Sequence, residues 1–498
     1  MKHKVVLFFP PYDGPPLGAP ACLLALASPL LEAGFEVSLV DAAITPDYER
    51  VIARETEDAL CLGVSLLTGP MIRAAVKVAR QVRQRQPSLP IIFGGWHPSL
   101  LPDETLRHEC ADVVIRGQGE LTLLEVAQRL ADSKDLAGVR GASFKQDGEV
   151  VHNPERPVEN INRLPSLAYH LVDFDAYERV RGIREVGYPS SVGCPYACNY
   201  CTDQVFYKRR FNAYRAERVV SEVGELVGRY RLEEIAFLDS NFPVDVKRAV
   251  AIARGLVDAK VKLHWTVQAS TDLVCRMSDD DVRLLVQSGL HHMGFGTESA
   301  SEEVLALMNK KHQRIADMFE TARKTEQAGM RVTFNVILGY PGETEQDRVE
   351  TFRIMSEIAR RHSNVSFSPN VFTPYPGIPI WPQLRELGVR EPQSLEEWDV
   401  VALGNNLLPW LQGETLDRLR RMIEYFLLNN QIRRATADVR WFGHGVRRAL
   451  GVPLRWRLRN NHYAFPWELW VARTTERLVT RRSLVTGQEL RHGMGEVC

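Results

Sequence analysis

The stretch Ser191-Val-Gly-Cys-Pro-Tyr-Ala-Cys-Asn-Tyr-Cys-Thr-Asp203 decides the fold, because it holds three of the eight cysteines in the spacing C-x-x-x-C-x-x-C. Thiolates at Cys194, Cys198 and Cys201 on one tight loop can converge on a metal or iron–sulfur centre. Closed zinc sites and fully ligated cubanes need four protein ligands, and no fourth Cys or His lies near this loop in the sequence. The spacing therefore favours a cluster with one iron open to a ligand over cysteines that are merely close together.

At this loop the sequence resembles the radical S-adenosylmethionine (radical SAM) superfamily. The signature of that superfamily has this cysteine spacing with an aromatic residue, here Tyr200, just before the last cysteine. The resemblance implies a [4Fe–4S] cluster held by the three cysteines, whose unique iron chelates the amino and carboxylate groups of SAM. It also implies that an electron delivered to the cluster cleaves SAM to methionine and a 5′-deoxyadenosyl radical.

Length and composition describe an ordinary globular enzyme. The 498 residues can form two to three domains with cores of their own. The chain is 45% hydrophobic and 25% charged with a formal net charge of zero, which favours no polyanionic partner. No apolar run approaches the roughly 20 residues of a membrane-spanning helix, and residues 5–9 are too short for a signal peptide. We expect a cytoplasmic protein whose other cysteines are free thiols.

Residues 1–135 alternate short β-rich runs with helical patterns. Strands are expected at residues 4–9, 36–40, 59–65, 91–93 and 112–115, with helices at 22–33 and 72–84. This alternation predicts a doubly wound, Rossmann-like parallel sheet with its ligand loops at the carboxyl ends of the strands. The loops after the strands are rich in small residues, which let a bulky ligand come close to the backbone.

Two of these loops resemble the cobalamin-binding fold, which shows Ser-x-Leu after one strand and Gly-Gly after a later one. This chain has Ser65-Leu66-Leu67 and then Gly94-Gly95 at the matching interval. In that family these positions flank the nucleotide tail of cobalamin. The cofactor-binding residues that the resemblance implies are Ser65, Leu67, Thr68, Gly94, Gly95, His97, Gly117, Gly119 and Glu120.

The first loop departs from the family pattern. It lacks the Asp-x-His-x-x-Gly motif that supplies a histidine to the lower face of cobalt, so we expect base-off cobalamin without a histidine below the metal. His97 is an axial candidate, although a lone His on a Gly-rich loop is more often a hydrogen-bonding wall residue. The alternative is that the domain has lost cobalamin and serves as a structural module.

Residues 136–185 form the expected link between two domains. Residues 137–151 predict a small β-hairpin around Gln146-Asp-Gly148, a type I′ turn signal. Prolines at positions 154, 157 and 165 then indicate an extended connector. We assign no chemistry to this segment.

Residues 186–385 again alternate strands and helices, in six β/α units. That number is too small for a closed eight-fold barrel. The radical SAM resemblance implies a partial, open (β/α)6 barrel with its cleft at the carboxyl ends of the strands. The fold class is therefore α/β: a Rossmann-like cobalamin-binding domain, then a partial barrel, then a helical C-terminal region at residues 386–498.

Polar residues follow the barrel strands. A carboxylate at a strand end can bind the SAM amine or ribose hydroxyls, and a turn fixed by Pro and Gly can line the adenine. The alternative for an acid at such a place is a structural salt bridge. Our catalytic candidates are Glu298 and Asp239, and our cofactor-binding candidates here are Tyr200, Asn241, Gln268 and Pro341.

The last hundred residues are helical in pattern. Helices are expected at residues 415–429 and 432–439, followed by a stretch rich in Arg, with Trp441, Trp456, Trp467 and Trp470 interleaved. Such a stretch can pack its Trp face on the barrel, can lie on an anionic membrane, or can hold nucleic acid. The neutral overall charge disfavours nucleic acid, which we do not expect as a partner.

Three further strings resemble the cobalamin-dependent radical SAM group: Gly294-Phe-Gly-Thr-Glu-Ser299, Gly339-Tyr-Pro-Gly-Glu-Thr344 and Thr373-Pro-Tyr-Pro-Gly-Ile-Pro-Ile-Trp381. With the first domain, the resemblance spans residues 1–385. It implies a methyltransferase that places a methyl group from methylcobalamin on an unactivated carbon, after the 5′-deoxyadenosyl radical removes a hydrogen. The expected partners are a small-molecule substrate, a lipophilic one if the membrane option holds, and an electron donor such as ferredoxin or flavodoxin.

Two other functions stay open. One is an oxidative cyclase or ring-rearranging enzyme of the same architecture, such as the anaerobic magnesium-protoporphyrin ester cyclases that the strings also resemble. The other is a cofactor-binding sensor without turnover, which would never form deoxyadenosine. Transfer of a methyl group to the substrate separates the first two.

Overall fold

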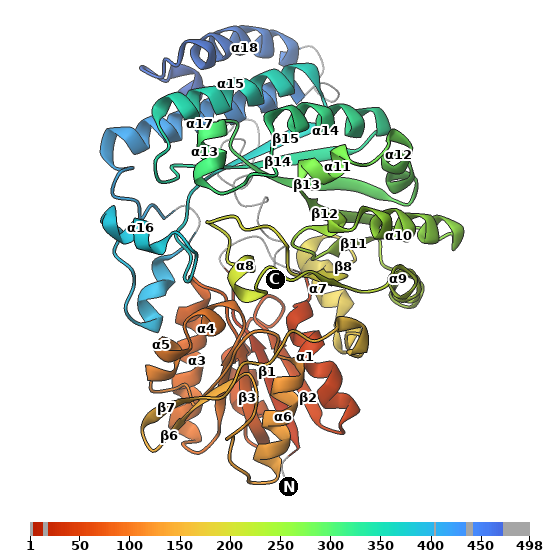
Figure 1. Cartoon of the computed structure of the whole chain (residues 1–498), viewed down its shortest axis with the longest axis vertical. Helices are drawn as coiled ribbons and strands as arrows, with labels where there is room; N and C mark the ends of the chain where they lie inside the picture. The colour runs from red at the N-terminus through yellow and green to blue at the C-terminus, as the bar shows by residue number, and fades with distance from the viewer. Residues whose placement is uncertain (1–2, 13–17, 403–404, 435–441, 472–498) are drawn as a thin grey trace.

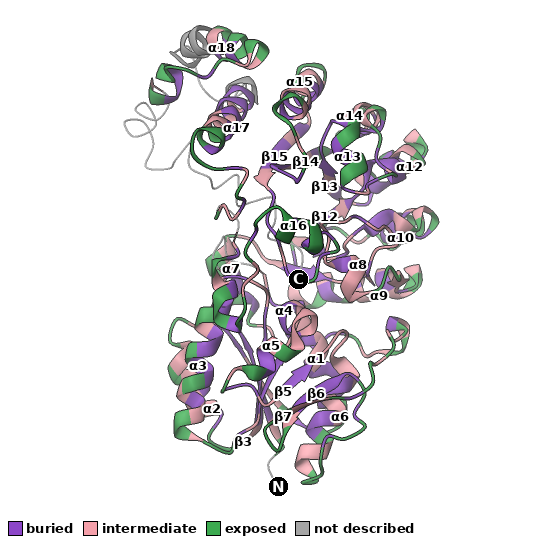
Figure 2. Cartoon of the chain, turned by 60° about the vertical axis from the view of Figure 1, so that its left-hand side comes forward, coloured by how far each residue is buried: buried purple, intermediate pink, exposed green. Residues whose placement is uncertain are grey.

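Two α/β domains lie one above the other, and a helical layer covers the far end of the second domain (Figure 1). This computed structural model describes residues 3–12, 18–402, 405–434 and 442–471. The inner strands of both domains are buried, whereas the outer faces of the surrounding helices are exposed (Figure 2). The α/β architecture with a helical C-terminal region agrees with the sequence-based prediction.

The first domain is built on a seven-stranded sheet with the order β2-β1-β3-β4-β5-β6-β7 in the described residues. Its parallel strands are β1 (Lys4–Phe9), β2 (Glu36–Asp41), β3 (Ala59–Ser65), β4 (Ile91–Gly94) and β5 (Val113–Ile115). Their apolar runs are mostly buried, as expected for a parallel sheet covered on both faces. The strand order switches between β1 and β3, which places the ligand crevice outside the carboxyl ends of these strands.

Helices cover both faces of this sheet. On one side lie α1 and α6, and on the other α2 and α3 (Figures 1 and 2). The helices of the domain are α1 (Ala21–Glu32), α2 (Tyr48–Glu55), α3 (Met71–Arg85), α4 (Trp96–Leu100), α5 (Pro102–Arg107) and α6 (Glu120–Ala131). The short α4 follows β4 directly, at the edge that faces the second domain.

The expected hairpin belongs to the first sheet. Strands β6 (Ala142–Gln146) and β7 (Glu149–His152) pair antiparallel, and β6 also pairs with β5. Asp147 and Gly148 have φ values of 51° and 86°, and a type I′ turn requires positive φ at both positions. We had placed this hairpin in the connector at residues 136–185. Instead it covers the otherwise open edge of β5 and extends the first sheet to His152.

The second domain contains six parallel strands in sequential order, with β8 and β15 at the two edges of the described sheet. They are β8 (Glu185–Tyr188), β11 (Glu234–Phe237), β12 (His264–Ala269), β13 (Leu290–Glu298), β14 (Arg331–Leu338) and β15 (Val365–Val371). The outer helices are α9 (Ala216–Tyr230), α10 (Val246–Asp258), α12 (Asp279–Gln287), α14 (Ile315–Ala328) and α15 (Glu345–Arg361). The predicted partial (β/α)6 barrel is thus confirmed.

Short elements complete the barrel. The ribbon β9 (Ser191–Val192) and β10 (Asn212–Ala213) flanks the cysteine loop, and α8 (Asp203–Phe206) follows it. Two further short helices of the barrel are α11 (Thr271–Cys275) and α13 (Glu302–Leu307), and α7 (Phe174–Arg181) belongs to the connector that precedes the barrel.

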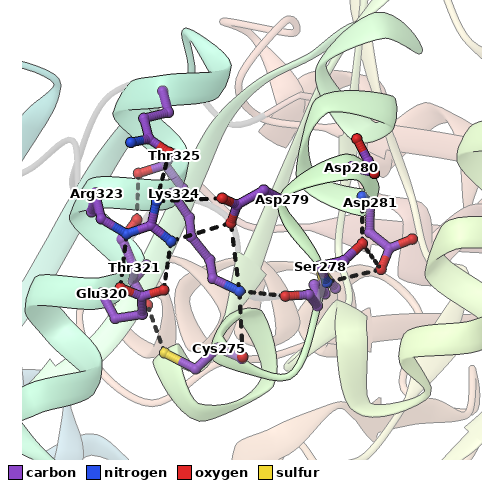
Figure 3. Close-up of polar contacts among 12 residues, drawn as sticks. Cys275, Ser278, Asp279, Asp280, Asp281, Glu320, Thr321, Arg323, Lys324 and Thr325 are labelled. Carbon is purple, nitrogen blue, oxygen red and sulfur yellow. Dashed lines mark hydrogen bonds and ion pairs between the residues drawn. The ribbon is translucent and has the colours of Figure 1, made fainter.

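Side-chain contacts on the outer layer fix the helices around the barrel. The hydroxyl of Ser278 accepts a hydrogen bond from the Asp281 N–H (3.1 Å), and the Asp281 carboxylate accepts one from the Ser278 N–H (2.9 Å), which caps the start of α12 (Figure 3). Arg323 of α14 reaches across to Asp279 (3.2 Å). Buried Lys324 donates to main-chain carbonyls at the end of α11 (Figure 3). Together these contacts hold α11, α12 and α14 in register.

Beyond the barrel, the chain returns to the first domain. After α16 (Trp381–Glu386), a 3-10 segment, η4 (Leu395–Val400), packs against α3. Arg73 pairs with Asp399 (2.6 Å) and Arg80 with Glu396 (2.8 Å). Trp398 of η4 is fully buried. We call η4 the strap, because it ties the two domains together.

The C-terminal layer consists of α17 (Gly413–Arg434) and α18 (Phe442–Asn460), which pack on each other and on α15. The helix expected at residues 415–429 corresponds to α17, which is longer than expected at both ends. Most of the second expected helix, at residues 432–439, lies outside the described residues. Of the four tryptophans in this region, Trp441 lies outside the described residues. The other three are exposed, which contradicts packing of their faces on the barrel. Within the described part of the chain, no helix is both long and apolar enough to cross a membrane.

Candidate active site

A cavity of about 470 Å³ lies at the carboxyl ends of the barrel strands, under the loops of the first domain. One wall is the cysteine loop, and another is formed by the ends of β12, β13, β14 and β15. Leu67 and Trp96 of the first domain close the opposite side. This is the cleft that a partial barrel offers to cofactor and substrate.

The three cysteines Cys194, Cys198 and Cys201 all line this cavity. Gly193 precedes them with a φ of 77°, and a Cβ there would lie 2.0 Å from the carbonyl oxygen of Arg210. Only glycine therefore permits the loop to turn this close to the ribbon. The Cys194 N–H donates to the Asp203 carboxylate (2.9 Å), which closes the loop.

The chemistry of the thiols fits an iron–sulfur cluster. Burial raises the pKa of Cys194 to about 11 and that of Cys201 to about 12, so the free thiols are protonated until a metal displaces the protons. Among the described residues, no group of three His, Cys, Asp or Glu could hold a single metal ion. A [4Fe–4S] cubane does not need three ligands around one metal ion, because each thiolate binds a different iron. Three soft ligands in one buried cavity match that demand.

Glu298 enters the cavity from a distorted strand end. A bulge interrupts β13 between Gly296 and Glu298, and Glu298 has a φ of 59°, which is rare for a residue other than glycine. Tyr200 donates a hydrogen bond to its carboxylate (2.9 Å). The acid predicted to be catalytic and the predicted cofactor-binding tyrosine therefore meet beside the cysteines.

Lys310 completes this group, although no sequence pattern pointed to it. Its ammonium nitrogen lies 3.1 Å from the Tyr200 hydroxyl and 3.5 Å from the Glu298 carboxylate. Burial opposes the charge, but the Glu298 carboxylate beside it raises the pKa of Lys310 above its ordinary value. The cavity thus contains a buried cation, which suits a carboxylate ligand.

Two amide oxygens in the cavity lack a hydrogen-bond donor. Asn241 uses its nitrogen to donate to Ser270 (3.1 Å), but its Oδ1 atom and that of Asn335 have no partner among the described residues. Unsatisfied buried acceptors are costly, so these two atoms are expected to receive ligand donors. Gln268 also lines the cavity, as we had expected for a cofactor-binding residue.

Asp239 and Pro341 do not line the cavity. The buried Asp239 carboxylate accepts hydrogen bonds from the Ser190 N–H (2.8 Å) and hydroxyl (2.7 Å), and from the Ser191 hydroxyl (2.5 Å). Because successive side chains at a strand end point to opposite sides, the neighbouring Ser240 faces the cavity instead. The structure therefore assigns Asp239 to anchoring the start of the cysteine loop and does not support a catalytic role.

A second cavity, of about 190 Å³, lies at the carboxyl end of the first sheet. Most of the residues that we linked to cobalamin line it: Ser65, Leu67, Gly94, Gly95, Gly117, Gly119 and Glu120. Thr68 lines the larger cavity instead. Leu67, Trp96 and Ser240 line both cavities, and Trp96 packs on Phe206 of α8 with ring centroids 4.3 Å apart. The two cavities are therefore neighbours across a thin wall.

The shape of the small cavity depends on Gly95. Its φ is 93°, and a Cβ there would lie 2.8 Å from the Leu66 carbonyl oxygen. Gln118 Nε2 and Glu120 Oε2 are buried in the lining without a hydrogen-bond partner in the described chain. Burial also raises the pKa of Glu120. A narrow apolar slot with unsatisfied polar atoms fits a flat ring that carries amide or hydroxyl groups, as the tail of cobalamin does.

His97 lines neither cavity. Its Nδ1 atom lies 3.0 Å from the Thr68 hydroxyl oxygen, and its ring packs edge-on against Trp398 with centroids 5.8 Å apart. Burial lowers the pKa of His97 to about 3. The structure therefore corrects the suggestion of an axial ligand and places His97 behind the wall, under the strap.

The fold and the two adjoining cavities define an α/β enzyme with one cofactor-binding domain set over the open mouth of a partial barrel. Residues 188–355 match the family model of the radical SAM superfamily, and residues 4–127 match that of the B12 binding domain. The chain thus joins a B12-binding domain to a radical SAM domain. These domains imply a [4Fe–4S] cluster, SAM and cobalamin as cofactors, as predicted from the sequence.

Several known proteins are similar to this chain over most of its length. An uncharacterized methyltransferase of Pyrococcus horikoshii is 27% identical over 84% of this chain and 88% of its own length. An anaerobic magnesium-protoporphyrin IX monomethyl ester cyclase of Rubrivivax gelatinosus is 24% identical over 82% of this chain and 74% of its own. The fold is shared with the radical SAM methyltransferase TsrM of Kitasatospora setae, solved with cobalamin and a [4Fe–4S] cluster, at a TM-score of 0.67, with 20% identity over 79% of this chain and 80% of that one.

Proposed function

We propose that this chain is a cobalamin-dependent radical SAM methyltransferase that places a methyl group on an unactivated carbon. The observation that carries the proposal is the shared wall of Leu67 and Trp96, which sets the slot that fits cobalamin directly beside the cavity of the three cysteines. When bound, the cluster with SAM supplies a 5′-deoxyadenosyl radical and methylcobalamin supplies the methyl group.

The residues around the cysteines suit the methionyl and ribose parts of SAM. The Lys310 ammonium attracts a carboxylate, and the free Oδ1 atoms of Asn241 and Asn335 accept from an ammonium or a hydroxyl. Glu298, held by Tyr200, accepts hydrogen bonds from ribose hydroxyls. These side chains orient SAM and exclude water from the cavity.

The first domain holds the tail of cobalamin in the small cavity. The glycines at positions 94, 95, 117 and 119 give the ring its space, and Ser65 and Glu120 supply polar contacts. No histidine belongs to the described lining of this cavity, and His312, in the described lining of the large cavity, stacks on Tyr196 of the cysteine loop with ring centroids 3.5 Å apart. We therefore infer base-off binding without a protein histidine below the cobalt.

The far end of the large cavity suits a lipophilic small molecule. Its walls are largely apolar or aromatic there: Tyr12, Leu100, Phe372, Tyr375 and Pro376. The acidic and basic side chains of the described lining are Asp203, Glu298, Lys310 and His312, and each belongs to the cysteine loop or contacts it. The substrate end thus offers few charges to pair with.

We also propose an acidic one-electron donor protein, such as ferredoxin or flavodoxin. Lys208, Arg209 and Arg210 form an exposed basic turn just after α8, and the Arg209 guanidinium donates to the carbonyl of Pro195 in the cysteine loop (3.3 Å). A basic patch at this place can steer an acidic protein to the cluster. With Lys208 and Arg210 replaced by Gln, reduction by flavodoxin should slow while reduction by dithionite stays unchanged. Equal rates with flavodoxin would remove this turn as the docking site.

The test of the reaction is methyl tracing. The reconstituted protein is incubated anaerobically with SAM labelled in its methyl group and with lipid extract of the source cells, and products are followed by mass spectrometry. A methyltransferase forms deoxyadenosine and a product that carries the label. Deoxyadenosine without any labelled product would contradict methyl transfer.

The similarity to the Rubrivivax gelatinosus cyclase favours a second candidate, an oxidative cyclase. The same tracing experiment separates the two functions, because ring closure consumes SAM without moving its methyl group to the substrate. A product that has lost hydrogen atoms and carries no label would identify the cyclase.

A further inference from the structure

The end of the described chain presents aromatic side chains to solvent. The exposed fraction is 86% for Phe465, 68% for Trp470, 53% for Trp456 and 49% for Trp467. All four belong to α18 and to the segment that follows it, at the edge of the molecule (Figure 1). We call residues 462–467 the aromatic loop. Four large, exposed apolar side chains within residues 456–470 are typical of an interaction site.

The aromatic loop is held rigidly from inside. Buried Arg457 of α18 donates to the carbonyl oxygens of Ala464 and Phe465 (2.8 Å for the latter) and to the carboxylate of buried Glu468 (2.6 Å). Glu468 also accepts from the hydroxyl of Tyr425 in α17 (2.9 Å). An ion pair inside the protein therefore fixes the backbone that carries the exposed rings.

The backbone of the loop is also unusual. Phe465 has a φ of 50°, in the left-handed region that residues other than glycine rarely adopt. Tyr463, two residues earlier, is buried against Tyr425 with ring centroids 5.6 Å apart. The turn thus sends Tyr463 into the protein and Phe465 out of it. A strained conformation that exposes an apolar ring points to a function for that ring.

Two exposed arginines lie on the helix that precedes the loop, and the acid that approaches the loop, Glu345 of α15, accepts from Asn461 (2.9 Å) and is paired with Arg418 (2.9 Å). Arg455 and Arg459 of α18 are exposed, and neither makes an ion pair within the described part of the chain. The acid in residues 451–471 is Glu468, and it is buried against Arg457. Exposed Arg beside exposed Trp and Phe is the combination that binds the headgroup layer of an anionic membrane.

We propose that the aromatic loop, with Trp456 and Trp470, inserts into the surface layer of an anionic lipid membrane, while Arg455 and Arg459 bind the lipid headgroups. Phe465 and Trp467 bury their rings among the acyl chains, and Trp456 and Trp470 lie at the headgroup level. This is peripheral contact, since none of the described helices could span a bilayer. The inference does not depend on the methyltransferase reaction.

The experiment measures binding of the full chain to vesicles by flotation. Vesicles of equal parts phosphatidylcholine and phosphatidylglycerol are compared with pure phosphatidylcholine. The protein should float with the anionic vesicles and less with the neutral ones, and salt should weaken the difference because it screens the arginines.

Two variants separate the contributions. Phe465→Ala/Trp467→Ala should lower the partition coefficient about tenfold on anionic vesicles, because two large apolar side chains no longer insert. Arg455→Gln/Arg459→Gln should abolish the preference for phosphatidylglycerol. The matched controls are Val257→Ala/Leu387→Ala for exposed apolar area and Lys247→Gln/Arg254→Gln for charge. All four positions are exposed and lie outside the C-terminal layer, and both double variants should bind like the parent.

Three results would overturn the proposal. The first is that the full chain does not float with anionic vesicles. The second is that the Phe465→Ala/Trp467→Ala variant keeps the melting temperature of the parent and floats as the parent does. The third result is a dimer of the parent protein, seen by sedimentation without lipid, that dissociates in the Phe465→Ala/Trp467→Ala variant. That result would assign the loop to contact between copies of the chain.

Discussion

Glu298 shows how one residue joins backbone strain to chemistry. Its positive φ and the bulge before it turn its carboxylate toward Tyr200 and the cysteines. Such conformations persist where the surrounding structure imposes them, and here Tyr200 and Lys310 hold the side chain. The strand end is therefore shaped for a ligand beside the cysteines.

Replacing Glu298 by Gln tests this assignment. The variant should still take up iron, since no cysteine is touched. It should weaken SAM binding about tenfold, because a hydrogen bond to a charged group contributes about 1.5 kcal/mol. Equilibrium dialysis of labelled SAM under anaerobic conditions measures the change. The control is Glu302→Gln, an exposed acid on α13, which should bind SAM like the parent. Unchanged affinity in Glu298→Gln would remove this residue from the SAM site.

The candidate residues divide by how local their signals are. The cysteines, Tyr200 and Glu298 belong to short strings with recognisable spacing, so the sequence alone could predict them. Lys310 belongs to no such string and reaches Glu298 only through the fold of the loop after α13. Asp239 was misassigned because a strand-end position does not tell which way a side chain points.

At the scale of elements, the strap η4 shows an interaction that no local pattern predicts. Trp398 is separated by some three hundred residues from the first-domain side chains that it contacts, among them His97 and Glu104. In the first domain, the parallel strands and the helices α1 and α3 have strong periodic patterns, and the sequence predicts them close to their bounds. Short helices such as α4 and α5 were missed, because a few residues carry no clear period.

Glu104 makes the strap sensitive to pH. Burial raises its pKa to about 7, aided by Glu391 and Glu397 and opposed by Trp398 and Arg107. Because this pKa lies above that of the unfolded chain, the folded state favours the protonated acid. Stability is therefore lost as the pH rises from the unfolded pKa through the folded pKa of about 7, and the loss is complete only above it.

Replacing Glu104 by Gln removes the titration. Melting temperatures of the parent and Glu104→Gln should be similar at pH 5. At pH 8 the variant should melt about 2 °C higher, since its neutral side chain avoids the buried charge. Glu32→Gln, at an exposed acid of α1 that makes no ion pair in the described part of the chain, is the control and should show no such pH dependence. A gain that is equal at both pH values would contradict the role of the Glu104 charge.

At the scale of the whole molecule, the central feature is that two cavities from two domains share a wall. Sequence patterns could predict each domain, because each has its own strand order and ligand loops. They could not predict that Leu67 and Trp96 face both cavities, because that depends on how the domains are docked through α4, α8 and the strap. The docking brings the slot for cobalamin to the cysteines.

The central claim is that one chain holds a cluster and a cobalamin side by side, and the direct measurement is metal content. The protein is reconstituted anaerobically with iron, sulfide and cobalamin, desalted and analysed for iron and cobalt. We predict about four irons and one cobalt per chain. Cys198→Ala should lose the iron and keep the cobalt, and Gly95→Val should lose the cobalt and keep the iron. The account would be contradicted if the parent lacked iron or lacked cobalt, or if each variant lost both metals.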